Sequence, residues 1–159
     1  MTPDPVDPLE LPDAAAWTAS YEGRPGLLDF VGVRVGLAGA LAVAKVLRPD
    51  LIDFRGCVLL RERFSHSSFE EWWEQLDGDV PEIESVVNHL HLWDLFEVED
   101  EDVLADRALG DLAVAIASSW RCLLAETYPD RRFHVRVTTS ANGDYGPTIS
   151  FASTSEEFR

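Results

Sequence analysis

The segment from Glu84 to Phe96 is the part of the chain richest in side chains capable of acid–base or metal chemistry. If this segment is helical, its polar residues share a stripe, because positions three and four apart lie on the same helix face. The catalytic candidates are Glu84, Asn88, His91 and Asp94. In this arrangement His91 could act as a general base that Glu84 orients through Asn88.

A metal site is a second interpretation of the same segment, since imidazole and carboxylate groups bind zinc and iron. Metal-binding helices usually present ligands four residues apart, whereas His89 and His91 are two apart and diverge by about 200° on a helix. A third interpretation is structural: Asn88 and His91 satisfy neighbouring backbone groups, and Asp94 caps a loop or accepts from a buried tryptophan. We prefer the structural interpretation and expect no metal and no cofactor.

The acidic residues are concentrated in one part of the sequence. Between Arg63 and Arg107 lie 43 residues without lysine or arginine, and 14 of them are acidic. The net charge of −16 repels nucleic acid and anionic membranes and attracts basic proteins. The densest acidic run supplies the predicted partner-binding residues: Glu97, Glu99, Asp100, Glu101 and Asp102.

The basic residues are also patterned. In a strand over residues 55–63, the odd-numbered arginines point to one side. His134 and Arg136 alternate with aliphatic residues, so we expect them on the outer face of a sheet whose inner face covers the core. Planar guanidinium groups suit carboxylate and phosphate ligands. The candidates for anion binding are Arg55, Arg61, Arg63 and Arg136.

The C-terminal segment, residues 132–153, predicts a β-hairpin with its turn near Asn142-Gly143. A register centred on Gly143 pairs Val135 with Phe151 and Val137 with Ile149. We expect that register because a slip of one residue scatters the apolar side chains over both faces.

The remaining pattern is mostly helical. Helices are expected over residues 29–47, 68–77, 81–96 and 102–127. The sequence therefore predicts an α+β domain. Its small, three-stranded, mainly antiparallel sheet consists of strand 55–63 and hairpin 132–153, packed against four or more helices.

Two apolar stripes on these helices have alternative interpretations. Gly32, Gly36 and Ala40 recur every four residues, which favours close packing inside the monomer or a homodimer seam. We expect a buried helix over residues 27–47, since its uncharged core is about half the length of a membrane span. Helical spacing also predicts that four large residues pack in the core: Phe69, Trp72, Trp73 and Leu76.

The chain ends and the cysteines bear on domain organisation. Residues 1–13 are expected to form a mobile, proline-rich tail, and residues 14–159 a single α+β domain. The first residues lack the basic and apolar regions of an export signal, so a cytoplasmic location is expected. Cys57 and Cys122 are then predicted to be free thiols.

The leading hypothesis is an acidic, non-catalytic binding protein that engages a basic protein partner through residues 70–106. An inhibitor, an immunity-type protein or a nucleic-acid mimic would be concrete forms of this role. One alternative is a small enzyme or ligand-binding protein that uses Glu84, Asn88 and His91. Another is a scaffold that self-associates. Direct contact with nucleic acid or with a membrane is not expected.

Overall fold

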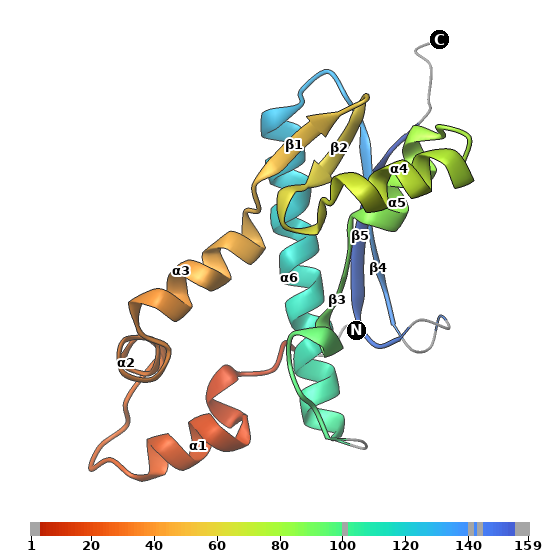
Figure 1. The fold of residues 1–159 in the computed structure, drawn as a ribbon. Coiled ribbons are helices and arrows are strands. Elements are labelled where there is room, and N and C mark those ends of the chain that lie inside the picture. The colour runs from red at the N-terminus through yellow and green to blue at the C-terminus, as the bar shows by residue number, and fades with distance from the viewer. Residues whose placement is uncertain (1–3, 100–101, 140–141, 143–144, 155–159) are drawn as a thin grey trace.

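A 25-residue helix, α6 (Val103–Thr127), forms the axis of the molecule (Figure 1). The computed structural model describes residues 4–99, 102–139, 142 and 145–154. Asp102 begins α6 as its N-cap, because its Oδ1 accepts a hydrogen bond from the Ala105 N–H at 3.0 Å. The buried residues of α6 recur every three or four positions and form one apolar face. They are Leu109, Ala113, Ile116, Ala117, Trp120 and Leu124.

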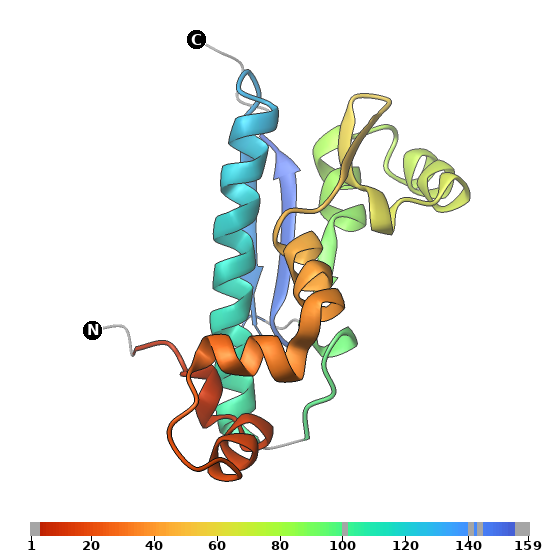
Figure 2. The same cartoon turned by 90° about the vertical axis from the view of Figure 1, so that its left-hand side faces the viewer.

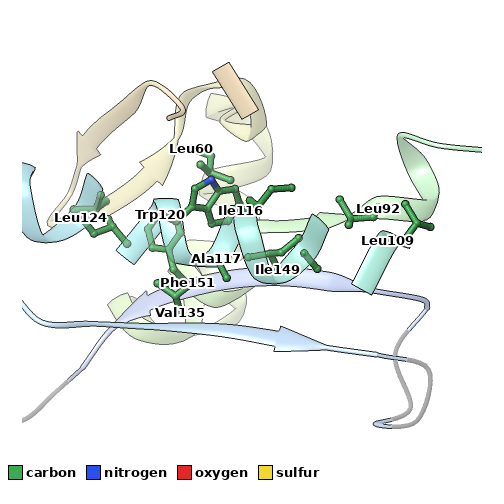
Figure 3. Close-up of a cluster of buried hydrophobic side chains, with 12 residues drawn as sticks. Leu60, Leu92, Leu109, Ile116, Ala117, Trp120, Leu124, Val135, Ile149 and Phe151 are labelled. Carbon is green, nitrogen blue, oxygen red and sulfur yellow. The ribbon is translucent and has the colours of Figure 1, made fainter. Parts of the chain in front are cut away.

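A three-stranded antiparallel sheet packs against this face in the order β3-β5-β4. Its strands are β3 (His89–His91), β4 (Phe133–Thr138) and β5 (Thr148–Ser153). Val135 lies opposite Phe151 and Val137 opposite Ile149, which confirms the predicted register of the hairpin. The inward side chains of β4 and β5 pack on Trp120 and its neighbours from α6 (Figure 3).

The predicted strand over residues 55–63 is wrong in its extent and in its pairing. It is a separate hairpin of β1 (Leu51–Phe54) and β2 (Cys57–Leu60), followed by a 3₁₀ turn at Arg61–Arg63. Arg55 and Gly56 form the connection with φ values of 49° and 82°. Two successive residues with positive φ make the tight turn that joins antiparallel strands.

Strand β2 is buried on both faces and joins two apolar clusters. Val58 and Leu60 belong to the cluster formed with α6. Cys57 and Leu59 belong to the second cluster, which includes Phe69. A continuously apolar strand is expected where both faces are covered.

The second cluster lies under the helices α4 (His66–Gln75) and α5 (Val80–Val87). Phe69 is buried and stacks on Trp73 with ring centroids 5.7 Å apart, which confirms that this side of the aromatic stripe is core. Trp72 belongs to neither cluster and lines a surface hollow of about 160 Å³. The prediction that Trp72 packs in the core is therefore wrong.

The chain's N-terminal part contains η1 (Pro8–Glu10) and α1 (Pro12–Ala19). The predicted mobile tail contacts the domain, since the Val6 N–H donates to Asp111 Oδ2 at 2.8 Å. Residues 1–3 lie outside the described part of the chain.

Residues Leu27 to Leu47, here called the apolar arm, extend to one side of α6 (Figure 1). The arm consists of α2 (Leu27–Phe30), a π-helical turn (Val31–Val35) and α3 (Gly36–Leu47). None of its residues is buried, so the expectation of a buried helix is wrong. By length and composition alone, the arm and α6 could each cross a membrane, although a third of the α6 window is buried in the core.

Candidate functional site

Glu84 lies at a junction between the two sheets. Helix α5 positions it: Asp79 caps the first turn by accepting from the Glu82 N–H, and Ile83 anchors the helix in the second cluster. The Glu84 side chain is fully buried. Its Oε1 accepts from the Val58 N–H at 2.8 Å and from the Arg131 guanidinium at 3.2 Å. Its Oε2 accepts from the N–H and the hydroxyl of Ser153.

Asn88 extends the same junction one helical turn later and is also fully buried. Its Oδ1 accepts from the Leu60 N–H at 2.9 Å, and its Nδ2 donates to the Val58 carbonyl at 2.8 Å. A longer contact of 3.4 Å reaches the carbonyl of Phe151 in β5. Glu84 and Asn88 thus satisfy backbone groups of β2 and β5 where no strand lies between them. This arrangement agrees with the structural interpretation of Asn88, and it gives Glu84 a similar structural role that the sequence did not predict.

His91 does not join Glu84 and Asn88, so the predicted polar stripe is not formed. Helix α5 ends at Asn88, and His89 to His91 pair as a strand with β5. His89 and His91 therefore share a face, with ring centroids 4.8 Å apart. Asp94 is exposed in the 3₁₀ turn Leu92–Asp94. Among the described residues, no group of three potential ligands could hold a metal ion.

The outer face of the three-stranded sheet is polar and basic. The register aligns Arg136 of β4 with Ser150 of β5 and then with His89 of β3. His91 forms a 2.7 Å hydrogen bond with the hydroxyl of Thr148. His134 and Arg136 are exposed on the side opposite the buried Val135, as the alternation predicted.

A hollow of about 340 Å³ opens on this face, and among the described residues no carboxylate lines it. The lining residues are Ser85, His134, Arg136, Ser150, Phe151, Ala152, Ser153 and Thr154. The hollow could receive a small anion, since Arg136 provides a guanidinium and Ser85 and Ser150 provide hydroxyl donors. Burial lowers the pKa of His89 on the same face, so its neutral form is favoured.

The other anion-binding candidates lie elsewhere. Arg55 pairs with Glu70 at 2.9 Å, and its guanidinium lies over Trp73, 5.2 Å from the ring centroid. Arg61 and Arg63 lie in a 3₁₀ turn rather than in a strand. The four arginines therefore do not form one plane, because the chain turns at Arg55 and leaves the strand after Leu60. Sequence reasoning missed His89 as a neighbour of Ser150, since it placed His89 on a helix.

The acidic segment 70–106 is divided between two ends of the molecule (Figure 1). Helices α4 and α5 lie at the level of the C-terminal half of α6, whereas Glu97 and Glu99 precede its N-terminal end in the chain. Helix α6 alone is about 37 Å long at 1.5 Å per residue. Asp102 is occupied as the cap of α6, and Asp100 and Glu101 lie outside the described residues.

The α4–α5 end combines exposed carboxylates with an incompletely buried aromatic ring. We call it the acidic face, and its exposed members are Glu71, Glu74, Asp77, Asp79 and Glu82. Trp72 lies between Glu71 and Glu74 on α4 but packs in neither core cluster. Comparisons of the chain with models of protein families, with curated proteins and with solved structures found no match.

Proposed function

We propose that this chain is a non-catalytic binding protein that engages a basic protein partner through the acidic face. The observation that carries the proposal is the absence, among the described residues, of any ion pair to the acidic face. The adjacent Glu70 provides the contrast, because it is paired with Arg55. Unpaired carboxylates around a cationic partner give fast, salt-sensitive association.

Trp72 supplies the apolar anchor that such an interface needs. Tryptophan is among the residues that most often dominate binding energy at protein interfaces. Here the ring borders a hollow formed with Ser68, Val86 and His89, while acidic side chains lie on either side of it along α4. A basic partner could place an apolar or aromatic group against Trp72 and a cation against the neighbouring Glu71. Glu74 is two residues further along α4 and points about 200° away from Trp72, so a second segment of the partner would contact it. Inhibitor, immunity-type and nucleic-acid-mimic roles all fit this surface.

The proposal limits the predicted partner-binding surface, residues 70–106, to α4 and the first turn of α5. It can be tested by capturing partners from lysate of the source cells at low and high salt. Two variants with the same change in charge locate the interface: Glu71→Lys/Glu74→Lys and Glu97→Lys/Glu99→Lys. We expect a basic protein to be recovered by the wild type and by the second variant but not by the first. Recovery of no basic protein, or equal loss with both variants, would contradict the proposal.

Ligand binding on the outer sheet face is a second candidate. It is favoured by the hollow around Arg136, which no carboxylate of the described residues lines. The ligand class would be a small anion with carboxylate or phosphate groups. Inorganic phosphate is a suitable probe, since a ligand that binds only the folded state raises the unfolding temperature, and raises it further at higher ligand concentration. Arg136→Gln should abolish this increase, and Arg61→Gln, outside the hollow, should preserve it. No increase in the wild type would exclude phosphate as a ligand of this hollow.

A further inference from the structure

The apolar arm exposes more large aliphatic side chains than any other described segment of comparable length. Its exposed large apolar residues are Leu27, Leu28, Val33, Val35, Leu37, Leu41 and Val43. Contiguous apolar surface on this scale marks an interaction site in soluble proteins. On α3 the exposed Leu37, Leu41 and Ala44 are spaced four and three residues apart and form one face.

Contacts at both ends fix the position of the arm. At its N-terminal end, Phe30 packs edge-on against Trp17 of α1, with ring centroids 5.4 Å apart. At its C-terminal end, the Trp120 indole N–H donates to the carbonyl of Val46 at 2.9 Å. Arg48, just beyond the arm, pairs with Glu126 at 2.7 Å. These contacts fix the two ends of the arm, and between them the side chains of Leu37 and Leu41 on α3 are 78% and 59% exposed.

The geometry of the arm disfavours insertion of the arm across a lipid bilayer. Gly36 adopts φ 67° and ψ 175°, a conformation that ends one helical segment and begins the next. Helix α3 has 12 residues, which gives about 18 Å against the roughly 30 Å of a bilayer core. Asp29, Arg34 and Lys45 also distribute charge along the arm.

We propose that a second copy of this chain covers the arm, with the two arms packed against each other across a two-fold axis. Seven large apolar residues of the arm are exposed, and a second arm would remove them from water. Asp29 is the only one of the chain's 29 acidic residues that lies in the arm. This is therefore a surface where two strongly acidic copies can meet with little repulsion. An exposed apolar face is also chemically complementary to itself, as a two-fold interface requires.

The dimer uses a different face from the small-residue seam predicted by sequence. Gly32 lies in the π-helical turn and Gly36 at the break, so Gly32, Gly36 and Ala40 do not form a continuous stripe of one α-helix. The surface that we assign to the dimer is instead the outward face of Leu37 and Leu41, extended by Val33. This assignment is independent of the acidic face, which lies at the far end of β1 and β2 from the arm (Figure 2).

Sedimentation equilibrium of the full chain tests the proposal directly, because it measures the mass of the particle in solution. The wild type should have twice the chain mass of 17.7 kDa at micromolar concentration. Leu37→Asp/Leu41→Asp should weaken dimerisation at least about 100-fold, because a charge would be buried in the interface. The matched control is Val103→Asp/Val114→Asp, because these two side chains are as exposed as the pair in the arm. Leu37 and Leu41 are 78% and 59% exposed, and Val103 and Val114 are 74% and 59% exposed. The control should remain dimeric, and both variants should keep the wild-type far-ultraviolet circular dichroism spectrum, which shows that the chain is folded. Only Leu37→Asp/Leu41→Asp should lose the dependence of the unfolding temperature on protein concentration.

Salt and vesicles separate this dimer from the other possibilities. Added salt should not weaken the dimer, because screening reduces the repulsion between two copies of like net charge. Added salt should weaken the binding of a basic partner, because screening reduces the attraction between opposite charges. A monomeric wild type, or equal dissociation of both variants, would overturn the proposal. A monomer that co-sediments with phosphatidylcholine vesicles, and loses this in Leu37→Asp/Leu41→Asp, would assign the arm to lipid instead.

Discussion

Replacement of Glu84 by glutamine removes a charge and one acceptor from the junction of the two sheets with almost no change in volume. Both carboxylate oxygens face donors: Oε1 faces Val58 and Arg131, and Oε2 faces Ser153. Whichever way the amide is turned, its NH₂ group therefore lies against at least one backbone N–H. A buried donor loses its acceptor in either orientation.

The expected loss can be estimated from these contacts. A hydrogen bond to a charged group contributes about 1.5–3 kcal/mol, and an unsatisfied buried group adds a cost of about 1–3 kcal/mol. The Arg131 side chain is 32% exposed, so water replaces part of what it loses. We expect Glu84→Gln to lower the free energy of unfolding by about 3 kcal/mol, out of a typical 5–15 kcal/mol. The melting temperature should fall by about 6–12 °C.

Urea unfolding followed by tryptophan fluorescence and far-ultraviolet circular dichroism measures this change. Glu82→Gln is the matched control, because it makes the same substitution at an exposed position of α5 and should change stability by less than about 0.5 kcal/mol. Equal unfolding midpoints for the two variants would refute the bridging role of Glu84. Unchanged stability together with loss of partner capture would assign Glu84 to function instead of structure.

Three further predictions follow from burial. Trp73→Ala should lower stability by about 3 kcal/mol and Trp72→Ala by less than about 1 kcal/mol, as urea midpoints would show, because only Trp73 packs in a core cluster. A thiol reagent should modify exposed Cys122 in the native protein and spare Cys57, whose pKa burial raises to about 11; equal rates by mass spectrometry would contradict this. Because burial lowers the pKa of His89, this imidazole binds a proton more readily in the unfolded chain than in the folded protein. The free energy of unfolding should therefore fall as the pH decreases below about 6.5. This fall should be shallower in His89→Gln, and identical pH slopes would exclude the effect.

The sequence was informative where one periodicity applied without interruption. The alternation around Val135 and Ile149 determined the register of the hairpin, because only one register places both on the core face. The apolar spacing of α6 likewise predicted its buried face. The structural interpretation of Asn88 also agrees with its contacts, although the groups that it satisfies belong to β2 and β5.

The errors came from places where tertiary contacts decide. The helical pattern continues past Asn88, but pairing with β5 converts His89–His91 into a strand. Arg55-Gly56 lacks the asparagine or aspartate of the commonest tight turns, so the β1–β2 hairpin was missed. An apolar helix has the same composition whether it is covered or exposed, and the exposure of the arm could not be inferred from its residues.

The association rate of the captured basic partner, measured by stopped flow over a range of salt, tests the proposed function most directly. The wild-type rate constant should fall at least about tenfold between roughly 50 and 500 mM salt, because charge complementarity acts mainly on association. At low salt, Glu71→Lys/Glu74→Lys should slow association about tenfold, while Glu97→Lys/Glu99→Lys should leave it near the wild-type value. A rate that does not depend on salt, or that falls equally in both variants, would contradict binding through the acidic face.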